Sequence, residues 1–170
     1  MLNVLRKSKE RRSLAARLCA AVVARARDPV FFARFGVKDT LDGRFDLVTL
    51  HAWLVLDRLN AAGVAPLAQA FVDTVFVGFD EALRELGAGD IGMGKRVKKL
   101  AGAFYGRLRA YGEAQDEAAM QDALVRNLYR GASAGGAKAL ARYVLRAKAR
   151  LKSCNLEGDA LDFGPLPDEE

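Results

Sequence analysis

Histidine and cysteine are scarce in this chain, which argues against most metal-binding and disulfide-stabilised folds. The 170 residues include one histidine, His51, and two cysteines, Cys19 and Cys154, which lie far apart. Structural zinc sites take their ligands from closely spaced positions, and neither cysteine has a partner at such a spacing. Isolated cysteines are typical of proteins from reducing compartments. We therefore expect no bound metal and no disulfide framework.

Long apolar runs and strand-like alternation are also missing. A membrane-spanning helix needs about 20 consecutive apolar residues, and no stretch of the chain approaches this length. The first residues also lack the apolar core of a secretory signal. We therefore expect a cytoplasmic protein, with peripheral contact at the inner face of the membrane as a further expectation. No segment alternates between apolar and polar residues as a half-buried strand does, so the sequence favours an all-α fold.

Helical periodicity is what the chain has instead, because apolar residues recur at spacings of three and four. We expect a single domain at residues 1–152, an irregular bundle of six or seven helices, followed by an acidic, disordered tail at residues 153–170. The helix that runs to about Asn60 is apolar over much of its surface, which indicates a central position. His51 lies within it, where a hydrogen-bonded core histidine is commoner than a ligand.

A glycine-rich corner at residues 80–100 separates an acidic helix end from a basic helix start. Gly87 is predicted to end the first helix with a positive φ angle, because glycine adopts that conformation without a Cβ clash. Asp90 is predicted to cap the second helix. This basic helix then opens with Lys95, Arg96, Lys98 and Lys99. Ion pairs across the corner explain these charges as well as acid–base catalysis would.

No enzyme is indicated by the motifs of the chain. Residues 87–92 formally match the G-x-G-x-x-G pattern of dinucleotide-binding proteins. That pattern binds phosphate only where a strand leads into a helix, whereas here it follows a helix. The same region has neither the spacing nor the Ser or Thr of a phosphate-binding P-loop. We therefore expect no nucleotide and no other cofactor, and a function in binding.

Positive charge is concentrated in two helices of a chain whose formal net charge is +6. Residues 1–27 hold eight Lys and Arg against one acid, and residues 138–152 hold six and no acid. Such helices could bind the phosphates of a nucleic acid or an anionic membrane surface. An all-α domain could also hold an apolar helix in a groove. Composition does not choose among these three.

Two pairs of apolar residues are candidates for contact with a partner. Phe31 and Phe32 lie in a short aromatic turn, which is either a lid on the core or an exposed anchor. Phe76 and Val77 fall off the main apolar stripe of their helix, so they either contact a second neighbour or are exposed. The sequence leaves both alternatives open for each pair.

Several motifs occur in one order along the chain. They are Asp28-Pro29-Val30-Phe31-Phe32, the run from Gly36 to Phe45, Glu85-Leu86-Gly87 with Gly89-Asp90, the run from Gly94 to Lys99, and Ala103-Phe104-Tyr105-Gly106-Arg107. Together they resemble the ubiquinol-cytochrome c chaperone family over roughly residues 15–150. Several motifs in register make this resemblance specific, whereas any one alone would be weak.

The resemblance implies an assembly factor for the cytochrome bc1 complex. Mitochondrial members bind newly made cytochrome b near the ribosomal exit, together with a small partner protein. We expect neither a mitochondrial presequence nor a membrane-anchoring segment of the kind they carry, and therefore a bacterial-type member. It also has Lys38 where the family pattern has a proline, and a looser turn at residues 92–94. The alternative function is nucleic-acid binding through the basic helices.

Residues within these motifs and helices are the predicted interaction sites. The client- or partner-binding candidates are Phe31, Phe32, Phe76, Val77, Asp42, Arg44, Glu85 and Asp90. A basic surface for the ribosome or an anionic membrane is expected at Lys95, Lys98, Lys99, Arg142 and Arg146.

Overall fold

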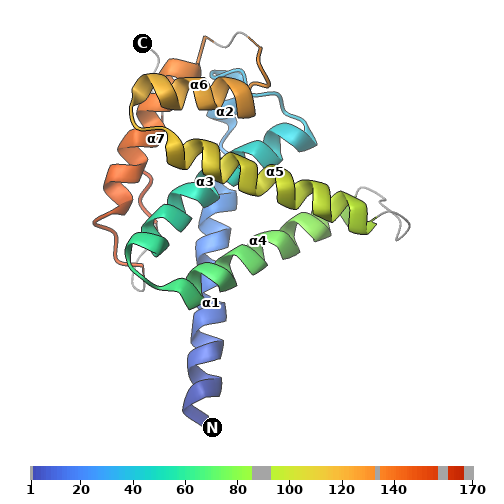
Figure 1. Ribbon diagram of the computed structural model, residues 1–170, viewed down its shortest axis with the longest axis vertical. Helices are drawn as coiled ribbons and strands as arrows, with labels where there is room; N and C mark the ends of the chain where they lie inside the picture. Colours follow the sequence, from blue (N-terminus) through green and yellow to red (C-terminus); the bar gives the residue numbers. More distant parts are fainter. Residues whose placement is uncertain (1, 86–92, 133–134, 157–160, 167–170) are drawn as a thin grey trace.

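The computed structural model describes residues 2–85, 93–132, 135–156 and 161–166, and this part of the chain forms seven helices and no strand. The helices are α1 (Leu2–Ala26), α2 (Pro29–Ala33), α3 (Leu41–Ala61), α4 (Ala65–Glu85), α5 (Met93–Glu113), α6 (Glu117–Asn127) and α7 (Ala137–Leu151). Six are long and α2 has a single turn (Figure 1). The expected all-α fold is confirmed. None of these helices is both long and apolar enough to cross a membrane.

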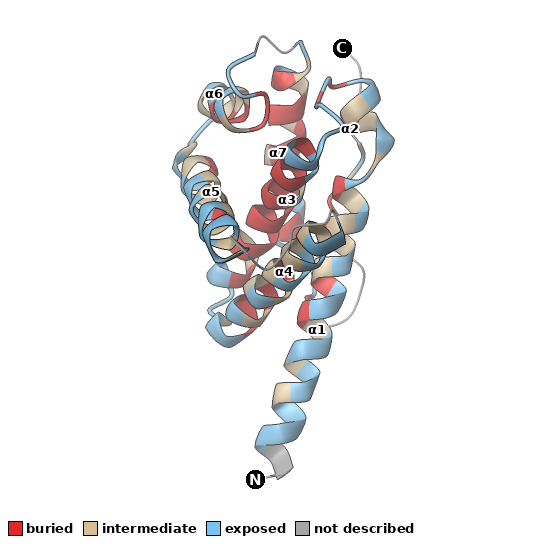
Figure 2. Cartoon of the chain, turned by 90° about the vertical axis from the view of Figure 1, so that its right-hand side faces the viewer, coloured by how far each residue is buried: buried red, intermediate tan, exposed pale blue. Residues whose placement is uncertain are grey.

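Helix α3 lies at the centre of the bundle, as its apolar surface predicts. Its side chains are buried over nearly the whole helix (Figure 2), and α1, α4, α5 and α7 pack against it. The helix starts at the Thr40 N-cap, whose hydroxyl accepts a hydrogen bond from the Gly43 amide at 3.1 Å. A Cβ at Gly43 would lie 2.0 Å from the Lys38 carbonyl oxygen, so only glycine allows this close approach.

His51 is a hydrogen-bonded core residue, as expected. Its Nδ1 lies 2.8 Å from the Leu47 carbonyl oxygen and donates to it, while its Nε2 accepts from the Tyr143 hydroxyl at 2.9 Å. Burial lowers the pKa of His51 to about 4, so the ring is neutral near pH 7. The Phe31 ring packs edge-on against it at 5.3 Å. Because Phe31 is completely buried, it is a lid on the core, and its alternative assignment as an exposed anchor is wrong.

The acidic tail is anchored to the domain in its described parts, residues 153–156 and 161–166. Phe163 is buried and packs edge-on against His51 at 5.4 Å. Arg25 donates to the Gly164 carbonyl, and Arg150 pairs with Asp162. For these residues the expected disorder is therefore wrong. The composition of the tail is acidic, but single apolar residues still reach the core.

The corner itself lies mostly outside the described residues. The predicted caps at Gly87 and Asp90 fall within residues 86–92, which the structure does not describe. Within α4, Asp80 pairs with Arg84 at 2.8 Å, one helical turn away. This pair is local and exposed, so it contributes little to stability.

Replacing Phe163 with Ala should lower the free energy of unfolding by about 3 kcal/mol, because it leaves a cavity beside His51. Urea unfolding of the whole chain measures this change. Pro165→Ala is the matched control, since Pro165 is exposed in the same segment and should change stability little. Equal stability of the Phe163→Ala variant and the parent would show that the tail is not part of the core.

Candidate functional site

An aromatic cluster joins α4 to α5. Phe76 of α4 packs edge-on against Phe104 of α5 at 5.2 Å and stacks on Tyr105 at 6.3 Å. Phe79 continues the cluster towards α3, with its ring centroid 4.9 Å from that of Phe45. The outer edge of the cluster is open, since Tyr105 is 53% exposed and the neighbouring Val77 is 56% exposed. Apolar surface is therefore available to a partner beside this cluster.

A groove of about 320 Å³ lies beside the cluster, between the start of α3, the end of α4 and the first half of α5. We call it the α4–α5 groove. Its apolar lining comes from Leu41, Phe45, Phe79, Ala82, Leu83, Leu100 and Ala103. Its volume falls at the lower end of the range of ligand pockets, so it would accept a few side chains rather than a whole helix.

The rim of the groove is mainly basic. It consists of Arg96, Lys99, Arg107, Arg130 and one acid, Asp42. An apolar floor with cations around it favours a partner that presents apolar side chains together with acidic ones.

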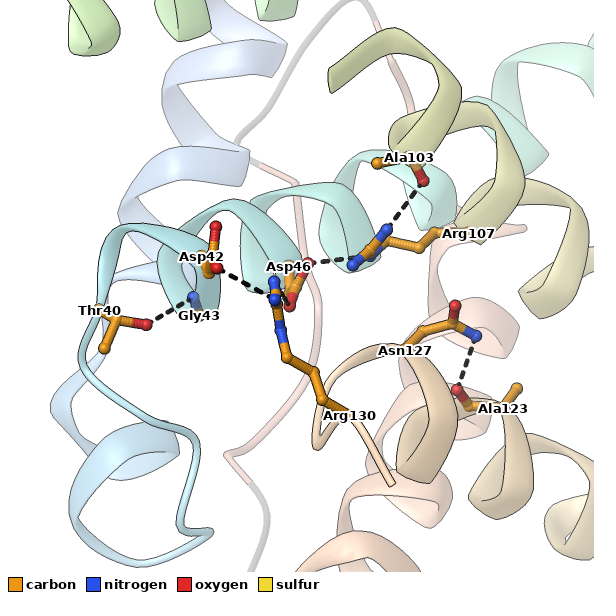
Figure 3. Close-up of polar contacts among 9 residues, drawn as sticks. All are labelled: Thr40, Asp42, Gly43, Asp46, Ala103, Arg107, Ala123, Asn127 and Arg130. Carbon is orange, nitrogen blue, oxygen red and sulfur yellow. Dashed lines mark hydrogen bonds and ion pairs between the residues drawn. The ribbon is translucent and has the colours of Figure 1, made fainter. Parts of the chain in front are cut away.

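Two of the rim arginines are held by a buried carboxylate, Asp46 (Figure 3). Asp46 is completely buried on α3, with Oδ1 lying 2.8 Å from Arg107 Nε and Oδ2 lying 3.2 Å from Arg130 Nη2. The second terminal nitrogen of Arg130, Nη1, lies 3.0 Å from Asp42 Oδ2. Arg107 also donates to the Ala103 carbonyl at 3.1 Å. These contacts join α3, α5 and the segment after α6.

The backbone after α6 directs Arg130 towards α3. Arg130 has a φ angle of +55°, the one positive value among the non-glycine residues that the structure describes. Gly131 follows with φ of +78°, and its amide donates to the Val125 carbonyl at 2.8 Å. A left-handed arginine is uncommon and costs conformational energy, so its contacts with Asp42 and Asp46 compensate for that cost.

Burial governs the protonation of this network. Desolvation raises the pKa of Asp46 to about 6, although Arg107 and Arg130 act in the opposite direction. Burial, with a further contribution from the Asp46 charge, also raises the pKa of Tyr111, whose phenol is therefore neutral. Because Asp46 is covered by protein, it orients the two arginines and does not face a substrate.

One known protein family matches most of the chain, including the residues of the groove and its network. The family model for the ubiquinol-cytochrome C chaperone matches residues 33–160. The chain belongs to this family. Membership confirms the resemblance seen in the sequence and indicates a role in assembly of the cytochrome bc1 complex.

A similar solved structure supports this assignment. The crystal structure of the Cbp3 homolog from Brucella abortus is similar to this chaperone-family chain, with 38% sequence identity and a TM-score of 0.82. The similarity covers 96% of this chain and 98% of that one. Among curated proteins, none matches the chain.

The structure brings several of the predicted residues of this family member to one place. Asp42 and Lys99 lie on the rim of the α4–α5 groove, and Phe76 packs in the adjoining aromatic cluster, whereas Val77 does not line the groove. Phe76 is half-buried in the aromatic cluster, whereas Val77 is exposed. Of the two alternatives that the sequence left open, contact with a second helix therefore applies to Phe76, and exposure applies to Val77.

Other predicted residues lie elsewhere. Arg44 pairs with Asp39 at 2.7 Å on the surface, and Phe32 is half-buried against the core. Glu85 is exposed at the end of α4. Asp90 lies outside the described residues.

The predicted basic surface is divided between two helices. Lys95 and Lys98 are exposed at the start of α5, near Lys99. On α7, Arg146 is exposed, but Arg142 is half-buried and pairs with Glu117 at 3.2 Å.

Sequence reasoning missed Leu41, Asp46, Arg107 and Arg130. Asp46 had a usable signal, because it is an acid flanked by the apolar Phe45 and Leu47 in the predicted central helix. A buried carboxylate needs partners, which would have directed attention to distant arginines. Nothing local in the sequence identifies which arginines those are.

Asp46→Asn should reveal the sign of the Asp46 pKa shift. The pKa is higher in the folded chain than in the unfolded chain, so this group's contribution to stability is largest below pH 4 and falls as the pH rises through about 6. The shift corresponds to about 3 kcal/mol. Urea unfolding at pH values of about 4 and 7 should therefore show the parent losing stability relative to the variant.

Asp42→Asn provides the comparison for this experiment. Asp42, like Asp46, contacts Arg130, but the side chain of Asp42 is 67% exposed. This variant should keep the pH dependence of the parent. A parent that gains stability relative to Asp46→Asn over the same pH interval would mean that the arginines outweigh burial.

Proposed function

We propose that this chain is an assembly chaperone that holds newly made cytochrome b, or another hydrophobic subunit of ubiquinol-cytochrome c reductase, at the α4–α5 groove. The observation that carries the proposal is the apolar lining of this groove, in which Leu41 is 46% exposed. Family membership supports the assembly role, and the client and its binding surface are our inference.

Hydrophobic burial would provide the affinity. A membrane protein that has not yet been inserted exposes apolar side chains, and covering them removes apolar area from water. A groove between helices accepts such side chains from an apolar segment. The basic rim would favour segments in which acidic residues flank the apolar ones, because the rim cations attract acidic residues and repel basic ones.

Surface attachment is a second part of the proposal. Lys95, Lys98 and Lys99 would face anionic lipid or ribosomal RNA while the groove holds the client. This placement corresponds to a peripheral protein at the inner face of the membrane. A small partner protein and nucleic-acid binding both remain alternatives for the same surface.

Leu41→Asp should weaken capture of newly made cytochrome b by about tenfold or more, because charge replaces exposed apolar contact area in the groove. The measurement is the amount of cytochrome b that co-purifies with the chaperone after coupled translation. Ala118→Asp is the matched control, as it adds the same charge at an exposed position on α6. It should leave capture unchanged.

Two outcomes would contradict the proposal. Equal capture by the Leu41→Asp variant and the parent would exclude Leu41 from the client site. Binding to generic RNA with a steep salt dependence, without retention of cytochrome b, would favour nucleic-acid binding instead. Photoreactive residues at positions 41 and 98, crosslinked in cells, would then identify what each surface contacts.

A further inference from the structure

The N-terminal half of α1 projects from the body of the domain. Figures 1 and 2 show this half of the helix extending beyond the other helices from both directions. Burial in the core begins at Ala15, and most of the side chains from Val4 to Ser13 are exposed. A projecting helix with no neighbouring helix in the described chain needs an explanation other than packing.

The projecting part of α1 is strongly basic. It carries Arg6, Lys7, Lys9, Arg11 and Arg12, and one acid, Glu10. Arg6 lies 3.7 Å from Glu10, but both side chains are more than 60% exposed. The other four cations make no ion pair with any residue that the structure describes.

Two basic residues at the end of α7 differ from those of α1, because they form ion pairs within the domain. Lys148 pairs with Asp57 at 3.1 Å, and Arg150 pairs with Asp162. The two basic helices of the sequence are therefore not equivalent, because these cations of α7 have counter-charges within the domain. Helix α1 offers its charge to an external partner.

Apolar side chains at the end of the projection indicate what that partner is. Val4 is 71% exposed and Leu5 is 65% exposed, so an apolar pair lies next to the cluster of cations. A bilayer surface provides anionic headgroups for the cations and an apolar boundary for the pair. A nucleic acid provides phosphates alone. A second copy of this helix would bring like charges together.

We propose that residues 4–12 of α1 bind an anionic lipid surface, with Val4 and Leu5 entering the headgroup boundary and the five cations contacting the headgroups around them. Clusters of four to eight Lys or Arg on a helix are typical of binding to anionic lipids. The proposal extends the peripheral localisation inferred above by adding a lipid contact on α1 to the one proposed on α5. It does not depend on the identity of the client.

Co-sedimentation of the whole chain with vesicles tests this proposal. The vesicles contain phosphatidylcholine alone or with about one-third phosphatidylglycerol, at low salt and at about 0.5 M salt. The parent should bind the anionic vesicles at low salt, and lose most of that binding at high salt or without phosphatidylglycerol.

Two charge-matched variants separate α1 from the rest of the domain. Lys9→Glu with Arg12→Glu should lower the affinity for anionic vesicles by about tenfold or more, because it reverses two charges at the contact. Arg126→Glu with Lys138→Glu, at exposed positions on α6 and α7, changes the net charge equally and should lower it by less than about threefold. A third variant, Val4→Ser with Leu5→Ser, should lower affinity while keeping the salt dependence of the parent. Circular dichroism checks that each variant is folded.

Three results would overturn the proposal. Equal losses in the two charge variants would mean that net charge alone controls binding. Salt-dependent binding to RNA that exceeds binding to vesicles and ignores Val4→Ser with Leu5→Ser would assign α1 to a nucleic acid. A dimer in sedimentation that this third variant dissociates would assign the tip to a second copy. Capture of cytochrome b is measured separately, so failure here leaves the groove proposal intact.

Discussion

Asp46 places a carboxylate inside the core, and the arrangement of the helices around it depends on how that charge is compensated. A buried ionised group is costly unless it is paired and hydrogen-bonded. Here the partners come from far along the chain, Arg107 on α5 and Arg130 after α6. Other packings of these segments would leave the charge unpaired. The pairing therefore selects one relative position of α3, α5 and the start of the α6–α7 connection, and that position determines the shape of the α4–α5 groove.

Local signals in the sequence predicted much of the fold. Thr40 and Asp116 act as N-caps, and Pro29 opens α2. These signals depend on only a few neighbouring residues, so they can be read without the tertiary structure. Gly36, which has a positive φ angle, likewise closes the aromatic turn.

The sequence left alternatives open where burial or exposure depends on distant residues. Phe31 is covered by His51 and Tyr143, whereas Phe76 packs against Phe104 of α5, and neither contact can be read from neighbouring residues. The tail was predicted from its average composition, whereas one anchor, Phe163, decides its position. Helix α1 includes the basic residues from Arg6 to Arg12, since lysine and arginine favour helix even where no apolar stripe is present.

Helix α1 contains neither glycine nor proline between Leu2 and Ala26, so nothing in its sequence introduces a kink. Its C-terminal half is fixed to the core, and Arg25 also contacts Tyr143 and Gly164. The projecting half is therefore a rigid extension, and the packing of the C-terminal half fixes the direction in which it leaves the domain. At a rise of about 1.5 Å per residue, the roughly ten residues before Leu14 hold the domain at a stand-off of about 15 Å. A surface bound at the N-terminal end of α1 would therefore lie at a fixed distance from the groove and in a fixed orientation to it, because a rigid helix and not a flexible linker connects the two.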